Sequence, residues 1–352
     1  MNKRIEGLEG MRGIAAFFVF THHFLLIFYP AFYFGQHSWI NHILNPDLAV
    51  SWFFVHSGYV LSIKGAELTG KAYWLQLRDQ ASRRYLRLLP LVLFSILLTY
   101  LCMKLNLIFN QEFGKRIGSV WLSQYLHFSP DLWEATQQSF YGVHFSFKSS
   151  STYNPNLWTI GHELISSYLL FAILAVIGWW KKSFWILFPL GFIIGPWKGL
   201  MCFLLGASLT RLPKLQLHPF VVGFIATTGF YLSDLKGNYE NHARSFGATL
   251  LMMALLQSPK MRMWLNSKMI HRLGEISYSL YVLHFLILVS FTSWIGLAWT
   301  PQESIFKVIL LYLMTTGLLI FASHYTWRYV DVPGIQIAKK FSSRLLSVRF
   351  FQ

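Results

Sequence analysis

Long apolar segments separated by short polar connections dominate this chain of 352 residues. Hydrophobic residues make up 54% of it, and only 12% of the residues are charged, about half the usual share in a soluble domain. A soluble protein of this length could not cover its surface with so few charges. In a bilayer, by contrast, an apolar helix satisfies its own backbone hydrogen bonds. The sequence therefore predicts an all-α polytopic transmembrane helix bundle. We expect one integral-membrane domain over residues 1–352, with no appended soluble domain.

The apolar segments predict about ten membrane spans. Two neighbouring spans, 183–197 and 198–212, are short for a crossing, so one broken hairpin is the alternative in this region. The ten predicted spans are 11–31, 47–63, 88–109, 157–180, 183–197, 198–212, 217–234, 243–258, 276–297 and 304–326.

Basic residues give the predicted orientation. If the N-terminus is cytoplasmic, 22 of the 30 Lys and Arg residues lie on the cytoplasmic side, as positively charged loops prefer. This asymmetry favours ten spans with both termini cytoplasmic. It makes 110–156 the longest extracytoplasmic loop, long enough to fold over the outer mouth as a lid. The formal charge of +16 is then a matter of topology, and no nucleic-acid partner is expected.

Ionisable residues inside the predicted spans are the candidate functional residues, because such placements are costly unless the side chain faces protein or water. Arg12 and His23, eleven residues apart, share one helix face and are separated by about 16 Å along the axis. His56 lies in the middle of the second span, beside Ser57 and Gly58, small residues that allow close helix contact. Glu163 lies six residues into the fourth span, where a purely structural pair is the alternative. A structural hydrogen bond to a neighbouring helix is the alternative for His23.

Two further patterns involve several residues each. Arg83, Arg84 and Arg87 form a cluster of forked donors suited to phosphate, although anchoring to anionic lipid would produce the same pattern. Ser277, Tyr281 and His284 recur at helical spacing on one face of the ninth span, so this polar stripe should face the bundle interior. Cys102 and Cys202 lie inside apolar segments and indicate neither a disulfide framework nor a metal site.

Six motifs in order, from residue 7 to residue 333, make the chain resemble acyltransferase family 3, the membrane-bound O-acyltransferases of bacterial surface glycans. His56 stands where that family usually has an apolar residue. The motifs are Leu8-Glu-Gly-Met-Arg12-Gly-Ile-Ala-Ala, Phe53-Phe-Val-His-Ser57-Gly58-Tyr, Arg83-Arg-x-x-Arg87-Leu-x-Pro90, Trp158-Thr-Ile-x-x-Glu163, Ile276-Ser-Tyr-Ser-Leu-Tyr-x-x-His284, and Asp331 shortly before Pro333.

The resemblance implies a multi-pass enzyme of the bacterial inner (cytoplasmic) membrane. It would transfer an acyl group, acetyl in the first instance, from cytoplasmic acyl-CoA to a hydroxyl of a surface polysaccharide or lipid-linked glycan. Acyl-CoA would be a co-substrate, with no bound cofactor and no metal, and the assembly could be a homo-oligomer. A transporter or flippase for a lipid-linked sugar or small solute is the alternative, and a structural partner of an export complex is a third.

The resemblance also suggests roles for individual residues. The donor would bind Arg12, Arg83, Arg84 and Arg87 at the inner surface. His23 would act as general base on the sugar hydroxyl or as a covalent acyl relay, and Glu163 would orient His23 and stabilise its imidazolium. The substrate channel would be lined by Ser57, Trp158, Tyr281 and His284.

Overall fold

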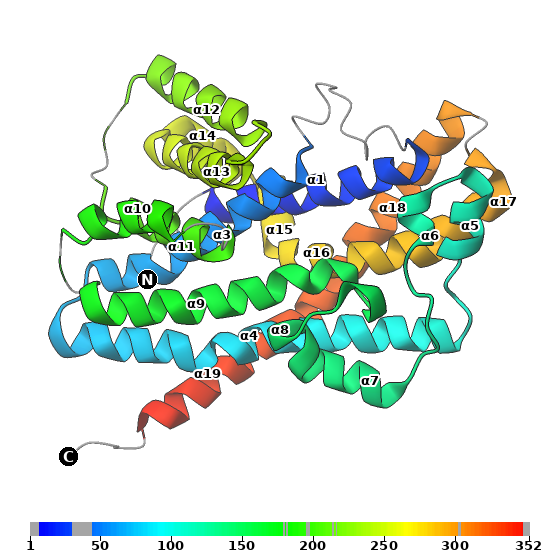
Figure 1. Ribbon diagram of the computed structural model, residues 1–352, viewed down its shortest axis with the longest axis horizontal. Coiled ribbons are helices and arrows are strands. Elements are labelled where there is room, and N and C mark those ends of the chain that lie inside the picture. The colour runs from blue at the N-terminus through cyan, green and yellow to red at the C-terminus, as the bar shows by residue number, and fades with distance from the viewer. Residues whose placement is uncertain are drawn as a thin grey trace.

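The computed structural model describes residues 7–29, 44–178, 180, 182–194, 198–212, 215, 217–301 and 304–347. Helices make up most of these residues and no strand occurs among them, which confirms the predicted all-α class (Figure 1).

A helix lies at each of the ten predicted spans. The helices are α1 (Leu8–Phe28), α3 (Pro46–Ala66), α4 (Gly70–Lys104), α9 (Trp158–Ile177), α10 (Phe184–Ile193), α11 (Lys198–Leu209), α12 (Pro219–Ser233), α13 (Glu240–Gln257), α16 (Ser277–Ile287), which continues through a π-helical turn into α17 (Ser293–Trp299), and α18 (Ile305–Thr326). Between α13 and α16 lie the short helices α14 (Pro259–Leu265) and α15 (Lys268–Glu275).

Five helical stretches are long and apolar enough to cross a membrane by length and composition. They are Leu8–Phe28, Gly70–Lys104, Pro155–Ile177, Ser277–Trp299 and Ile305–Leu346. The helices α10 and α11, of 10 and 12 residues, are shorter than a bilayer core and pack against each other, as the hairpin alternative requires. The count of ten crossings and the cytoplasmic termini stay predictions.

Two helices extend beyond their predicted ends. Pro90 lies inside the continuous 35-residue helix α4, although a proline in a helix interior often breaks or kinks the helix. Gly334 approaches the Pro90 ring closely, so the absence of a side chain at Gly334 lets the last helix cross α4 at this point. That last helix, α19 (Val332–Ser347), follows α18 through a π-helical turn at Trp327–Asp331. The motif ending at Pro333 therefore does not terminate the helix.

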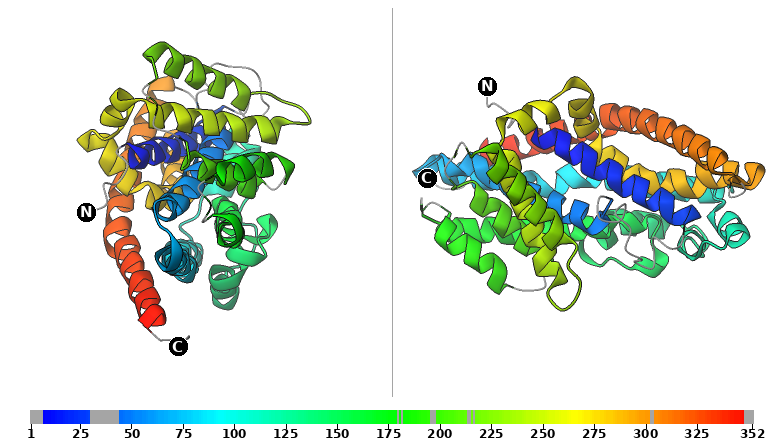
Figure 2. Two further views of the ribbon diagram at one scale, coloured as in Figure 1. Left: turned by 90° about the vertical axis from the view of Figure 1, so that its left-hand side faces the viewer. Right: turned by 90° about the horizontal axis from the view of Figure 1, so that it is seen from above.

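Contacts between helix ends group the connections at two ends of the bundle. The guanidinium of Arg211 donates to the carbonyl oxygens of Ala66 (2.6 Å) and Gly178 (2.6 Å), which brings together the ends of α3, α9 and α11. At the opposite end, the amide of Phe109 donates to the carbonyl of Val289. The start of α1 and the end of α19 both lie in the left-hand half of Figure 1, and the views of Figure 2 agree. Connections that the sequence predicts on the same side of the membrane thus lie at the same end of the bundle.

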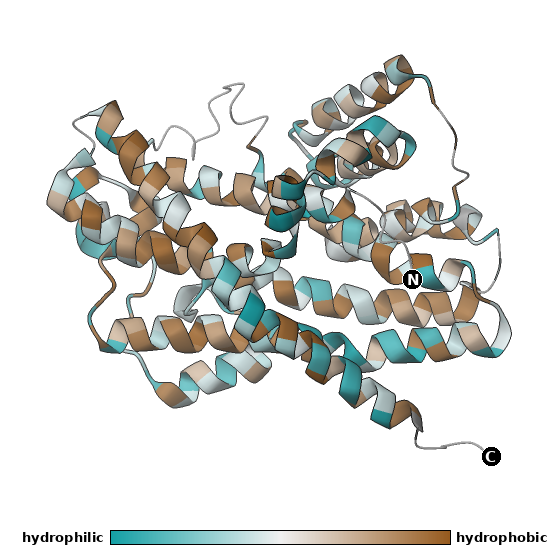
Figure 3. Ribbon diagram, turned by 180° about the vertical axis from the view of Figure 1, so that it is seen from behind, coloured by the Kyte–Doolittle hydropathy of each residue, from teal (hydrophilic) through white to brown (hydrophobic). Residues whose placement is uncertain are grey.

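The predicted extracytoplasmic loop contains two separate helical units. Helices α5 (Asn110–Ile117) and α6 (Val120–Ser123) pack near the end of α1 and against α17. The second unit, α7 (Leu132–Gln137) with its continuation to Phe145, runs back along α4, where the Tyr85 hydroxyl donates to the carbonyl of Phe140 (2.7 Å). Trp133 and Tyr141 of this unit are exposed. Hydrophobic residues occur along most helices of the bundle (Figure 3). A lid over the outer mouth would therefore comprise only the first unit.

Candidate active site

A cavity of about 230 Å³ lies between α1, α3, α4, α9 and α16. Three arginines line it, Arg12 from α1 and Arg84 and Arg87 from α4, together with Glu163 from α9. Tyr281 and Thr159, whose hydroxyls lie 3.0 Å apart, form part of its wall. The cavity therefore holds four charged side chains within a lining that also contains many apolar residues.

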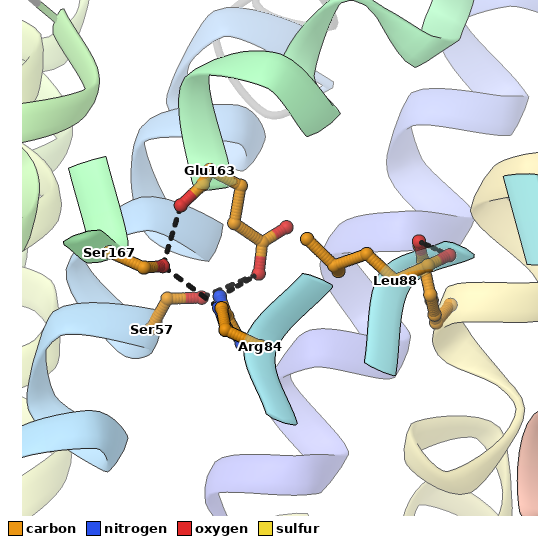
Figure 4. Close-up of polar contacts among 6 residues, drawn as sticks. Ser57, Arg84, Leu88, Glu163 and Ser167 are labelled. Atoms are coloured by element: carbon orange, nitrogen blue, oxygen red, sulfur yellow. Dashed lines mark hydrogen bonds and ion pairs between the residues drawn. The ribbon is translucent and has the colours of Figure 1, made fainter. Parts of the chain in front are cut away.

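Glu163 is held by Arg84 and Ser57 (Figure 4). One guanidinium nitrogen of Arg84 lies 2.5 Å from Glu163 Oε1, and Arg84 Nε donates to the hydroxyl of Ser167 at 2.8 Å. Ser57 Oγ donates to the same carboxylate oxygen at 3.4 Å. Because α4 and α9 run antiparallel here, one turn of each helix places the arginine opposite the carboxylate. Removal of either charge would leave the other poorly compensated inside the bundle.

The other two arginines of the basic cluster have different surroundings. Arg87 pairs with the buried Asp331 at 2.5 Å and lines the cavity, with its guanidinium over the ring of Tyr278. Arg83 instead pairs with Asp79, one turn earlier on the same helix, at 3.1 Å and does not line the cavity. Of the predicted donor-binding cluster, Arg84 and Arg87 thus face the cavity.

Arg12 is the cavity arginine without a fixed partner. Within the described part of the chain it forms no hydrogen bond and no ion pair, whereas Arg84 and Arg87 each have a carboxylate. It lies on α1 one residue before Gly13, whose close approach to Gly274 brings α1 against the helix α15. The cavity therefore contains one uncompensated positive charge, which suits an anionic ligand.

His23 lies farther along α1 and outside the cavity lining. Its Nδ1 is 2.9 Å from His284 Nε2, and its ring stacks on Trp121 with a centroid distance of 5.1 Å. The amide nitrogen of Asn156 lies 2.8 Å from the same His284 Nε2. Because an amide nitrogen can only donate, His284 Nε2 accepts, and His23 Nδ1 then carries the proton that it donates. This tautomer leaves the lone pair of His23 Nε2 available to take up a proton.

The structure separates the predicted site residues into two groups. Arg12, Ser57, Arg84, Arg87, Glu163 and Tyr281 line the cavity, whereas Arg83, His23, His284 and Trp158 do not. His23 and Glu163, predicted as partners, have different partners, His284 and Arg84. The close cation explains this outcome, because a carboxylate gains more from an arginine than from a neutral imidazole. Trp158 packs edge-on against His162, at 5.5 Å between ring centroids.

Two polar residues of the cavity lining, Tyr278 and Thr159, have no predicted role, and neither does Asp331, the partner of Arg87. Asp331 was recognised only as part of a terminal motif, and its pairing with Arg87, 244 residues away, required the fold. Tyr278 and Thr159 sit beside residues that were assigned, and helical spacing from Tyr281 and Glu163 would have indicated them.

The comparisons with known proteins agree with the motifs. A family model described as an acyltransferase domain, that of acyltransferase family 3, matches residues 5–324. No curated protein and no solved structure matches the chain. Since the family match covers most of the chain and includes every helix that contributes to the cavity, the protein belongs to acyltransferase family 3.

Proposed function

We propose that this membrane acyltransferase transfers an acetyl group from cytoplasmic acetyl-CoA to a hydroxyl of an extracytoplasmic or lipid-linked sugar, in the inner membrane of a bacterium. The observation that carries the proposal is the cavity lined by Arg12, Arg84 and Arg87 in a chain of an acyltransferase family. Neither a bound cofactor nor a metal has a role in this reaction, and acyl-CoA is a co-substrate.

The arginines support an acyl-CoA donor. Coenzyme A carries several phosphate charges at one end and a thioester at the end of a narrow pantetheine arm. Forked guanidinium donors bind phosphate oxygens in pairs, and the charge of Arg12 has no carboxylate partner. An arm that enters past α4 would carry the thioester into the cavity while the nucleotide stays at the surface.

The position and tautomer of His23 support a hydroxyl acceptor on the extracytoplasmic side of the cavity. Its Nε2 lone pair can take the proton of a sugar hydroxyl, and His284 holds its Nδ1–H. The hydroxyl oxygen then attacks the acyl carbon, the bond between the acyl group and its carrier breaks, and the proton passes from His23 to the departing group. His23 is partly exposed, and Trp121 covers one face of its ring.

Purified protein in lipid nanodiscs, supplied with acetyl-CoA and an acceptor glycan, tests the function. With the protein and both substrates present, we expect continuous release of the free thiol of CoA. Without acceptor, we expect at most a single stoichiometric burst of CoA. A transporter or flippase would move its solute across proteoliposomes and leave the thioester intact. Intact acetyl-CoA with every acceptor glycan offered would contradict the proposal. Mass spectrometry of surface glycans from cells with and without the gene identifies the acceptor.

A further inference from the structure

His56 is a buried histidine of the cavity that the proposed reaction has not used. It lies on α3 with 6% of its surface exposed, and it lines the same cavity as Arg12 and Glu163. Its Nε2 is enclosed by protein without a hydrogen-bond partner. Within the described residues, neither ring nitrogen of His56 forms a hydrogen bond, although its sequence neighbour Ser57 donates to Glu163.

An unpartnered imidazole in this position is costly for packing alone. A buried polar group without a partner costs about 1–3 kcal/mol, which an apolar residue at this position would avoid. In its neutral form the imidazole keeps a lone pair on one nitrogen, as a nucleophile requires.

The position of His56 contrasts with that of His23. His56 faces the space where the arginines would hold the donor, whereas His23 does not line the cavity and lies about 16 Å beyond Arg12 along α1. The phenol of Tyr281, hydrogen-bonded to the Asn156 carbonyl at 2.9 Å, forms part of the cavity wall on the His284 side. A thioester held in the cavity thus meets His56 first.

We propose that His56 is the first acyl acceptor, so that transfer proceeds in two steps through an acylated histidine. This inference rests on the proposed acyl-CoA donor. In the first step the lone pair of His56 Nδ1, the ring nitrogen that is not enclosed, attacks the thioester carbonyl carbon, the C–S bond breaks, and the sulfur leaves with the electron pair. The acylated ring gives up its N–H proton to the thiolate, which yields a neutral N-acylimidazole and free CoA. Arg12 stabilises the negative oxygen that develops on the carbonyl.

In the second step a hydroxyl activated on the His23 side attacks the acyl carbon. The C–N bond breaks, and the hydroxyl proton returns through His23 to the imidazole of His56, which regenerates the starting state. The two histidines therefore divide the reaction, with His56 serving the donor half and His23 the acceptor half.

Half-reactions measured on purified protein in nanodiscs test this division. Without acceptor, mixing with radiolabelled acetyl-CoA should release one CoA per protein, and peptide mass spectrometry should place one acetyl group on His56. The His56→Phe and His56→Gln variants should lose the burst at least 100-fold while still binding CoA. The His23→Ala variant should keep the burst and lose transfer to the glycan.

The matched control is His144→Phe, because His144 is fully buried and unpartnered at both ring nitrogens but lies outside the cavity, against Tyr85. It should retain burst and transfer. A burst that survives in His56→Phe, or an acetyl group found on His23, would overturn the proposal. Partial rescue by His56→Gln would also overturn it, since an amide can replace a hydrogen-bond donor but not this nucleophile. Loss of all CoA release in the wild-type protein, with donor and acceptor both present, would instead refute the proposed function itself.

Discussion

Arg84 and Glu163 form the ion pair on which the cavity is built, and each is expected to depend on the other. Glu163→Gln alone or Arg84→Met alone should destabilise the folded protein by about 3 kcal/mol, because one charge is left without its partner inside the bundle. The double variant should recover most of that stability. Unfolding in detergent, followed by tryptophan fluorescence, measures this coupling. Additive losses in the double variant would mean that the two side chains act independently.

The second residue-scale prediction concerns the hydrogen bond between His23 and His284. His284→Phe removes the acceptor that fixes the tautomer of His23, so transfer to the glycan should fall about 10- to 100-fold, as when outer-shell partners of other histidines are lost. His23→Ala should abolish transfer, whereas His22→Ala should lower it only partly, because His22 points about 100° away around the helix. Acylated glycan is measured at matched membrane expression. Full transfer by the His23 variant would remove His23 from the mechanism.

At the scale of elements, the crossing of α3 and α11 determines where His56 and Ser57 lie. Gly58 has no room for a side chain, because the backbone of Phe203 occupies the position of a Cβ atom, and Gly206 approaches Val55 in the same way. Gly58→Ala should therefore force the helices apart and cost about 1–3 kcal/mol. Gly223→Ala in α12 is the control, since nothing lies within 4 Å of its added carbon. Equal thermal stability of the two variants would contradict the close crossing.

The helices themselves were largely predictable, but their ends were not. Apolar length located a helix at each predicted span because backbone groups in lipid must pair internally. Pro90 lies within α4 and does not end it, and Gly334 of α19 packs against its ring. The unit 132–145 was not predicted as a helix because most of its large apolar residues face outward while it packs along α4, an arrangement that periodicity within one segment does not reveal.

For the whole molecule, the basic-residue asymmetry predicts which end faces the cytoplasm. In a background with Cys102 replaced by alanine, Lys71→Cys should react with an impermeant maleimide only when the cytoplasmic face is open. Lys115→Cys should react from outside intact cells. Both side chains are exposed, so accessibility depends on sidedness and not on packing. Labelling of Lys71→Cys in intact cells would place the arginine cluster on the wrong side for a cytoplasmic donor.

Six of the ten predicted site residues line one cavity, although their pairings were not predictable from the sequence. Arg12, Arg84 and Glu163 line the same cavity, because each is an ionisable group that must leave the lipid and face the interior. The sequence could not show that Glu163 pairs with Arg84 and not with His23, or that Asp331 reaches Arg87. These pairings depend on how α4, α9 and the π-helical turn after α18 are placed against one another. No pattern within a single helix contains that information.

The separation of the arginine-lined cavity from His23 has an electrical consequence. If the phosphates of the donor stay with the arginines and only an acetyl group passes between the histidines, no net charge crosses the membrane field. Moving one charge through 100 mV would involve about 2.3 kcal/mol, whereas a neutral acetyl group involves none. Transfer in proteoliposomes should therefore proceed at the same rate when a potassium gradient with valinomycin polarises the membrane in either direction. A succinyl group, which carries a carboxylate, would make the rate depend on voltage, so the membrane potential itself reports which acyl group the protein is built to carry.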